Sequence, residues 1–204
     1  MLRNDSVCST DAHDPPWLEM RQPNLKLRGE AALVVIDVQD RLAPVMDPSL
    51  FESMIANLKR LGAARTALDL PVVMTEQYPK GLGPTLPAVV EAFPDVERLD
   101  KVTFSLAGTP RIETALSALG RPKLIVAGME AHVCVYQTVR DLAERYELHV
   151  LKDALAARTR ENFDVGLRLI ERAGGVITST ETVLFDLLGQ AGTEAFKLVS
   201  RLVR

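Results

Sequence analysis

Two patterns of apolar residues alternate along the chain. Short segments, several of them continuously apolar, are typical of strands buried on both faces of a parallel sheet. Longer stretches carry apolar residues at helical spacing and begin with capping residues such as Asp47 and Thr109. Strands are predicted at Ala31–Val38, Pro71–Thr75, Glu97–Val102, Lys123–Ala127, Leu148–Leu151 and 174–178. Helices are predicted at about 47–68, 86–93, 109–120, 131–145, 161–173, 180–188 and 192–203, and a loop at 78–84.

Strands that alternate with helices predict an α/β fold. We expect a three-layer α/β/α, Rossmann-like fold with a six-stranded parallel sheet in the order 3-2-1-4-5-6. Ligands bind such sheets beyond the carboxyl ends of the strands, where the strand order reverses. Asp37 ends the first strand and Cys134 follows the fourth, so the two should meet at that crevice.

Composition narrows the class of protein. The chain has 204 residues and a net charge of −3, which gives no electrostatic reason to expect binding to nucleic acid or a membrane surface. Its two cysteines, Cys8 and Cys134, cannot form a disulfide framework, so a cytoplasmic location is expected. Residues 1–28, with several acidic residues and Pro15–Pro16, are predicted as a flexible N-terminal arm, and 29–204 as a single domain.

Cys134 is the candidate nucleophile. It lies near the start of a predicted helix, where backbone N–H groups and the helix dipole favour the thiolate. The simpler interpretation is an inert, buried cysteine. The glycine-led turn before it, from Gly128, could supply N–H groups to an oxyanion, or it could be a plain helix start. His132 is predicted to be a rim or interface residue rather than the base for the thiol.

Two further residues could act with this cysteine. Asp37 could serve as its general base, although a structural carboxylate fits the pattern equally well. Lys101, at the end of the third strand, could stabilise developing negative charge, although a solvated lysine is the commoner case.

Three motifs give these residues a family context. They are Val34–Gln39 (VVIDVQ), Asp100–Ser105 (DKVTFS) and Gly128–Thr138 (GMEAHVCVYQT). Together they resemble the isochorismatase-like cysteine hydrolases, a superfamily that includes nicotinamidase and N-carbamoylsarcosine amidase. The similarity spans about 30–188, and Thr75–Thr85 (TEQYPKGLGPT) resembles the subgroup of isochorismatase domain-containing proteins.

The resemblance implies a site and a reaction. It implies a catalytic triad of Asp37, Lys101 and Cys134, a cis peptide bond between Met129 and Glu130, and an oxyanion hole formed by the N–H groups of Glu130 and Cys134. The expected reaction is hydrolysis of a small amide-type C–N bond through a thioester. The resemblance also implies a homo-oligomer.

Other features limit the inference. Residues 41–101 contain no histidine, so we expect no catalytic metal, no cofactor and no nicotinamide substrate. Two alternatives stay open: a non-catalytic or redox-responsive binding and assembly protein, and an isochorismate-type ether hydrolase, although Cys134 argues against the latter. Gln39 is expected to orient Asp37. Candidates for pocket lining are Gln39, Gln77, Tyr78, Phe104 and Tyr136.

Overall fold

The chain folds into three layers, with a parallel sheet between two layers of helices. The computed structural model describes residues 25–204. Its six strands follow the predicted order β3-β2-β1-β4-β5-β6, which confirms the fold class. They are β1 Ala31–Ile36, β2 Val72–Gln77, β3 Arg98–Lys101, β4 Lys123–Met129, β5 Glu147–Ala156 and β6 Val176–Thr178.

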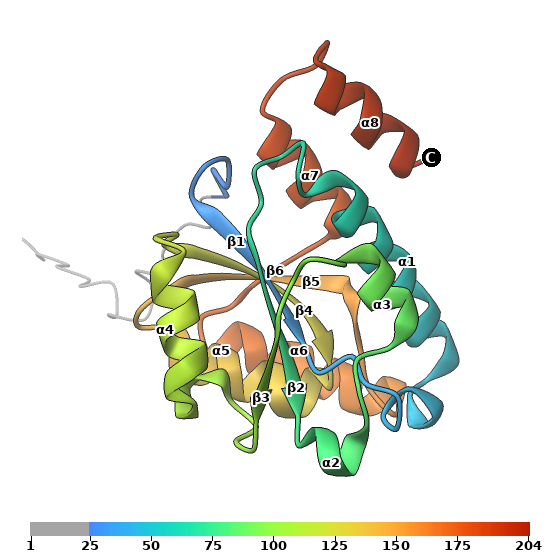
Figure 1. The fold of residues 1–204 in the computed structure, drawn as a ribbon, viewed down its shortest axis with the longest axis vertical. Helices are drawn as coiled ribbons and strands as arrows, with labels where there is room; N and C mark the ends of the chain where they lie inside the picture. The colour runs from blue at the N-terminus through green and yellow to red at the C-terminus, as the bar shows by residue number, and fades with distance from the viewer. Residues whose placement is uncertain (1–24) are drawn as a thin grey trace, which may run out of the picture.

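Helices cover both faces of the sheet (Figure 1). One layer holds α1, α3 and α7, and the other α4, α5 and α6, because the chain reverses its direction across the sheet between β3 and β4. The helices are α1 Pro48–Ala64, α2 Pro79–Leu82, α3 Pro87–Ala92, α4 Pro110–Ala118, α5 Tyr136–Leu142, α6 Arg160–Arg172, α7 Thr180–Leu188 and α8 Glu194–Leu202. None of these helices is both long and apolar enough to cross a membrane.

The core is built on the two central strands, since every residue of β1 and β4 is buried. Continuous apolar runs therefore do predict strands that are covered on both faces. At the amino edge of the sheet, Leu27 is buried and its N–H donates to Asp186 Oδ1 at 2.6 Å. The last residues of the predicted arm, 25–28, thus pack on the domain, whereas residues 1–24 lie outside the described part of the chain.

Several predicted boundaries were wrong. Strand β5 continues to Ala156, past the polar pair Lys152–Asp153 that ended the predicted strand, and its register with β4 shifts between Val126 and Gly128. The predicted loop at 78–84 contains the short helix α2, and β2 runs on to Gln77. The predicted helix at 131–145 is a π-helical turn, Ala131–Val135, followed by α5. Each irregularity lies at the carboxyl edge of the sheet.

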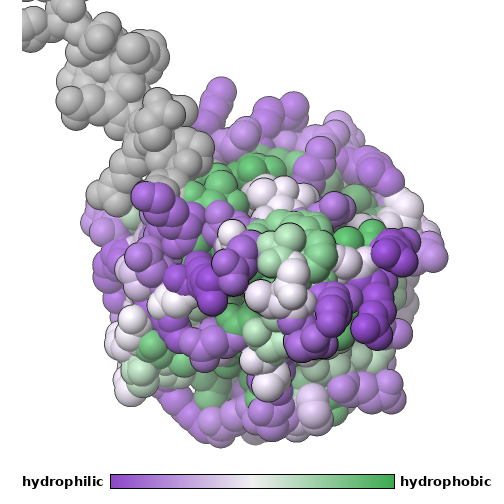
Figure 2. Space-filling view, turned by 90° about the horizontal axis from the view of Figure 1, so that it is seen from above, coloured by the Kyte–Doolittle hydropathy of each residue, from purple (hydrophilic) through white to green (hydrophobic). Residues whose placement is uncertain are grey.

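The last helix forms an outlying part of the fold. Val199 is its only fully buried residue, while Phe196 makes an edge-to-face contact with the half-exposed Phe185 of α7, the ring centroids lying 6.4 Å apart. Seen from above, the surface over these helices mixes hydrophobic and hydrophilic side chains (Figure 2). Nothing here assigns that surface to a subunit contact, so the homo-oligomer stays a prediction.

Candidate functional site

The candidate site lies at the carboxyl edge of the sheet, where the ends of β1, β2, β3 and β4 meet. Asp37 follows β1 directly and has a left-handed backbone (φ 53°), which is uncommon outside glycine but tolerated by aspartate. Its N–H donates to Thr75 O at 3.1 Å. Beside it, a Cβ atom on Gly128 would lie 2.1 Å from Ile36 O, so only glycine allows this approach of β4 to β1.

Asp37 and Lys101 form a buried ion pair. Lys101 Nζ lies 2.6 Å from Asp37 Oδ2, and neither side chain is exposed. The Thr75 hydroxyl donates to the other carboxylate oxygen at 2.8 Å. Although β2 separates β3 from β1, the lysine side chain spans that distance. Both charges are thereby compensated, as buried charges must be.

The remaining donors of the Lys101 ammonium are also used. Nζ donates to Gln77 Oε1 at 2.7 Å and to the backbone oxygens of Phe104 and Thr103 at 2.9 and 3.2 Å. Because Lys101 and Gln77 are register partners in β3 and β2, the sheet itself sets this arrangement. Lys101 is a cation fixed in position.

Cys134 joins this pair from the π-helical turn that follows β4. The peptide bond between Met129 and Glu130 is cis, and the turn begins at Ala131. The thiol lies close enough to the Asp37 carboxylate and to the backbone of Glu130 for both groups to shift its pKa, and Cys134 is only 5% exposed. The structure therefore brings together the three residues that the sequence singled out.

The resting thiol is protonated, contrary to expectation. Burial and the charge of Asp37 raise the pKa of Cys134 to about 12, while Lys101 and the Glu130 backbone act in the opposite direction. Burial also raises the pKa of Asp37 above its ordinary value, against the effect of Lys101. The expectation of a thiolate was wrong because it considered the helix start and not the burial or the neighbouring carboxylate.

An ion pair that the sequence analysis missed lies beside the cysteine. Arg158, which follows β5, donates to both carboxylate oxygens of Glu130, with distances of 3.0 Å from Nε to Oε2 and 3.1 Å from Nη2 to Oε1. The Glu130 side chain is nearly buried, and that of Arg158 is 55% exposed. Its position directly after β5, the neighbour of β4, could have indicated Arg158, since strand ends converge at this edge.

The five candidates for pocket lining take different positions. Gln77 contacts Lys101 directly, whereas Gln39 contacts the backbone of Gln77 and Gly83 and does not orient Asp37 as expected. Tyr78 and Phe104 are about half exposed. The Arg140 guanidinium lies over the Tyr136 ring, with its Cζ 5.8 Å from the ring centroid.

His132 and the acidic residues offer no metal site in the described part of the chain. Within residues 25–204, no group of three or more His, Cys, Asp or Glu side chains could hold a metal ion. In the same range His132 Nδ1 is a buried atom without a hydrogen-bond partner. His132 itself is half-buried.

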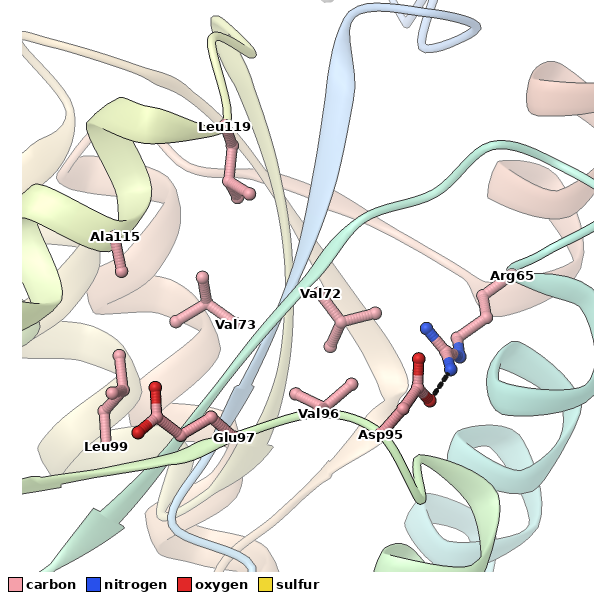
Figure 3. A pocket seen from close by; sticks show the side chains of 9 residues that line it. All are labelled: Arg65, Val72, Val73, Asp95, Val96, Glu97, Leu99, Ala115 and Leu119. Atoms are coloured by element: carbon pink, nitrogen blue, oxygen red, sulfur yellow. Dashed lines mark hydrogen bonds and ion pairs between the residues drawn. The ribbon is translucent and has the colours of Figure 1, made fainter.

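Two surface hollows lie apart from these residues. One, of about 290 Å³, is formed at the amino ends of β2 and β3, opposite the candidate site; Val72, Val73 and Val96 form part of its lining (Figure 3). Arg65 pairs with Asp95 at its rim. The other, of about 310 Å³, lies between the starts of α1, α6 and α7. Neither is lined by Asp37, Lys101 or Cys134.

Comparisons with known proteins show a matching family. The model of the family described as "Isochorismatase domain" matches residues 31–182. The chain is 35% identical over 182 residues to the secreted isochorismatase effector Isc1 of Phytophthora sojae, covering 85% of this chain and 84% of that protein. It is 32% identical over 175 residues to isochorismatase domain-containing protein 2 of Danio rerio, with coverage of 85% and 86%.

A solved structure shows the same fold. The structure described as MAR1 ribonuclease from Caenorhabditis elegans superposes with a TM-score of 0.78 at 35% identity, covering 86% of this chain and 90% of that one.

Proposed function

The chain belongs to the isochorismatase family, and from that premise we propose that it is a metal-independent cysteine hydrolase that cleaves a small amide through a thioester on Cys134. The observation that carries the proposal is the convergence of three side chains: the Cys134 thiol lies beside the Asp37 carboxylate, which is paired with Lys101 at 2.6 Å. It supplies a nucleophile, a base within reach and a cation that holds the base.

The first half-reaction begins with proton transfer. As the Cys134 sulfur attacks the amide carbon, its proton passes to the Asp37 carboxylate, and the carbonyl oxygen becomes an oxyanion. The N–H groups of Glu130 and Cys134 would stabilise that oxyanion. Asp37 then gives the proton to the amide nitrogen, the C–N bond breaks, and ammonia or an amine leaves.

The second half-reaction restores the enzyme. Asp37 takes a proton from water as the water oxygen attacks the thioester carbon. The C–S bond breaks, the acid product leaves, and the proton returns to the sulfur. No step of this scheme requires a metal or a cofactor.

The raised pKa of Cys134 supports the role of Asp37 as base. Since a thiol with a pKa of about 12 is almost wholly protonated near neutral pH, deprotonation must accompany attack. The same protonation counts against the redox-responsive alternative, because thiolates are the form that oxidants attack. It does not distinguish one carbonyl substrate from another.

The side chains at the rim of the site indicate the polarity of the substrate. The exposed apolar side chains of Tyr78, Val102 and Phe104 follow β2 and β3, and the Glu130–Arg158 pair is neutral overall. These features fit a small uncharged amide.

A panel assay tests the proposal. Ammonia or amine release should be measured for aliphatic, aromatic and N-carbamoyl amides with the wild-type protein and with Cys134→Ala, and Cys8→Ala serves as the matched cysteine control. Activity should vanish in Cys134→Ala and persist in Cys8→Ala. Retained amide hydrolysis in Cys134→Ala would overturn the mechanism.

The panel should also contain RNA and isochorismate. RNA is included because the similar Caenorhabditis elegans structure carries the name ribonuclease. Hydrolysis of either compound without hydrolysis of any amide would reject the amidase proposal. No turnover of any compound, with a thiol that still reacts with alkylating agents, would favour the non-catalytic alternative.

A further inference from the structure

Two buried glutamines connect to the ion pair of the site. Gln39 is fully buried and Gln77 is 7% exposed. Such amides are costly to bury unless each donor and acceptor finds a partner. Their partners form one continuous series that ends at Lys101.

Gln77 is held at both ends of its side chain. Its Nε2 donates to Val102 O at 2.9 Å, and its Oε1 accepts from Lys101 Nζ at 2.7 Å. Because the carbonyl of Val102 accepts only hydrogen bonds and the ammonium of Lys101 donates only, the amide has one orientation that satisfies both. Besides Asp37, Gln77 is the side chain that accepts from Lys101.

Gln39 fixes the backbone of Gln77. Its Oε1 accepts from Gln77 N at 2.7 Å, and its Nε2 donates to Gln77 O at 3.0 Å and to Gly83 O at 2.6 Å. The side-chain amide of Gln39 is thus committed to β2 and to the segment after α2. Any effect it has on the ion pair must pass through Gln77.

We propose that Gln39 and Gln77 form an amide relay that positions Lys101 against Asp37 and Cys134. This inference rests on the proposed function for the assignment of Lys101 as the cation of the site. Both glutamines are positioning residues, since neither touches the reacting sulfur. Without the Gln77 acceptor, the three N–H groups of Lys101 would be shared among Asp37 and the backbone oxygens of Thr103 and Phe104 alone, so the ammonium would move from its present position between Gln77 and Asp37.

Alkylation of Cys134 reports the position of Lys101 directly. The charge of Lys101 lowers the pKa of Cys134, so a displaced ammonium raises the pKa of the thiol. Below that pKa the alkylation rate follows the thiolate fraction, so a shift of one pH unit slows the reaction by about tenfold. The probe is iodoacetamide, and a Cys8→Ser background leaves Cys134 as the single thiol of the chain.

The experiment compares Gln77→Met, Gln39→Met and the double variant with the surface control Gln190→Met, following alkylation by intact mass from pH 7 to 10. Gln77→Met should slow alkylation by about tenfold at each pH, while Gln190→Met matches the parent protein. Gln39→Met should act in the same direction. In the double variant the two effects should not add, because both act through one contact.

Two outcomes would overturn the relay. One is an alkylation rate in Gln77→Met that matches the parent protein at every pH, even though the substitution lowers the melting temperature. The other is a double variant in which the effects of the two substitutions on the alkylation rate add. If Gln77→Met does not fold, Gln77→Asn carries the test: slowed alkylation supports the relay, and the parental rate rejects it. Because the readout needs only a reactive thiol, it stands even if the amide panel fails, whereas retained hydrolysis in Cys134→Ala would reject the proposed function alone.

Discussion

The two edges of the sheet both bury ionisable groups, and they differ in how those groups are paired. At the carboxyl edge, Asp37 and Lys101 are fully covered and hydrogen-bonded on every side. At the amino edge, His149 is also fully buried. Its Nε2 lies 2.8 Å from Glu147 Oε1, but the two atoms do not have the geometry of a hydrogen bond, and its Nδ1 has no hydrogen-bond partner among the described residues.

This difference separates a site from a structural cluster. Complete pairing holds the charges of the carboxyl edge in one geometry, as chemistry requires. At the amino edge, burial lowers the pKa of His149, although Glu147 opposes the shift, so the imidazole is neutral and simply packs. A buried titratable group is therefore evidence for a site only when its partners converge.

The largest expected effect comes from Asp37→Asn. Turnover of an active amide should fall by about a thousandfold, because the base is lost. Alkylation of Cys134 by iodoacetamide near pH 8 should become faster, because the negative charge that raises the pKa of the thiol is gone. Amide turnover and intact mass measure the two effects. Slower alkylation in this variant would contradict the electrostatic account of the site.

Next come two lysine substitutions that compare the edges. Lys101→Met leaves a buried carboxylate without its cation, so the free energy of unfolding should fall by about 3–5 kcal/mol. Lys123→Met, at the amino edge, removes the partner of Glu30, which lies 3.1 Å away and is half exposed. It should cost about 1–2 kcal/mol. Urea denaturation gives both values, and equal losses would refute the distinction between the edges.

Two glycines, one just before β4 and one near its carboxyl end, give a finer comparison. Both Gly120 and Gly128 have positive φ, but a Cβ atom on Gly120 meets nothing within 4 Å, whereas one on Gly128 strikes the backbone of Ile36. Gly128→Ala should therefore destabilise the fold by about 3 kcal/mol and Gly120→Ala by about 1 kcal/mol. Thermal unfolding tests this. A Gly128→Ala protein as stable as Gly120→Ala would show that β1 and β4 need not approach so closely.

The smallest effect concerns acid stability at the amino edge. The pKa of His149 is lowered in the folded state, so the unfolded chain binds a proton at this residue more tightly than the folded chain does. The folded state therefore loses stability as the pH falls below about 6.5, the ordinary pKa of histidine. Between pH 7 and 5, the free energy of unfolding should decrease by about 1 kcal/mol less in His149→Leu than in the wild-type protein. Melting temperatures across this range measure it, and an unchanged acid slope in the variant would count against a neutral, buried His149.

Much of this could be predicted from the sequence. The continuous apolar runs predicted the strands. Asp37, Lys101 and Cys134 were candidates because each lies at or just after a strand end, and the resemblance to the isochorismatase-like hydrolases implied that they form a triad. The protonation state of Cys134 was predicted wrongly. The thiolate was expected because a helix start is visible in sequence, whereas the burial of Cys134 and the approach of Asp37 depend on packing.

The contacts of the residues around the triad could not be predicted from the sequence for a similar reason. Glu130 and Arg158 are 28 residues apart in the sequence, and Gln39 and Gln77 are 38 apart. No local sequence pattern predicts a contact over such separations. Each pair forms because neighbouring strands of the sheet, or the segments that follow them, end at the same edge. Once the order of the strands is known, these contacts become candidates.

The central claim is that Cys134 forms a covalent intermediate, and rapid acid quenching of a reacting mixture followed by intact-mass and peptide analysis tests it most directly. With an amide that the protein hydrolyses, we predict a fraction of the chain heavier by the acyl group, with the added mass on the peptide that contains Cys134 and none in Cys134→Ala. Full turnover without any adduct, undiminished in Cys134→Ala, would contradict the account.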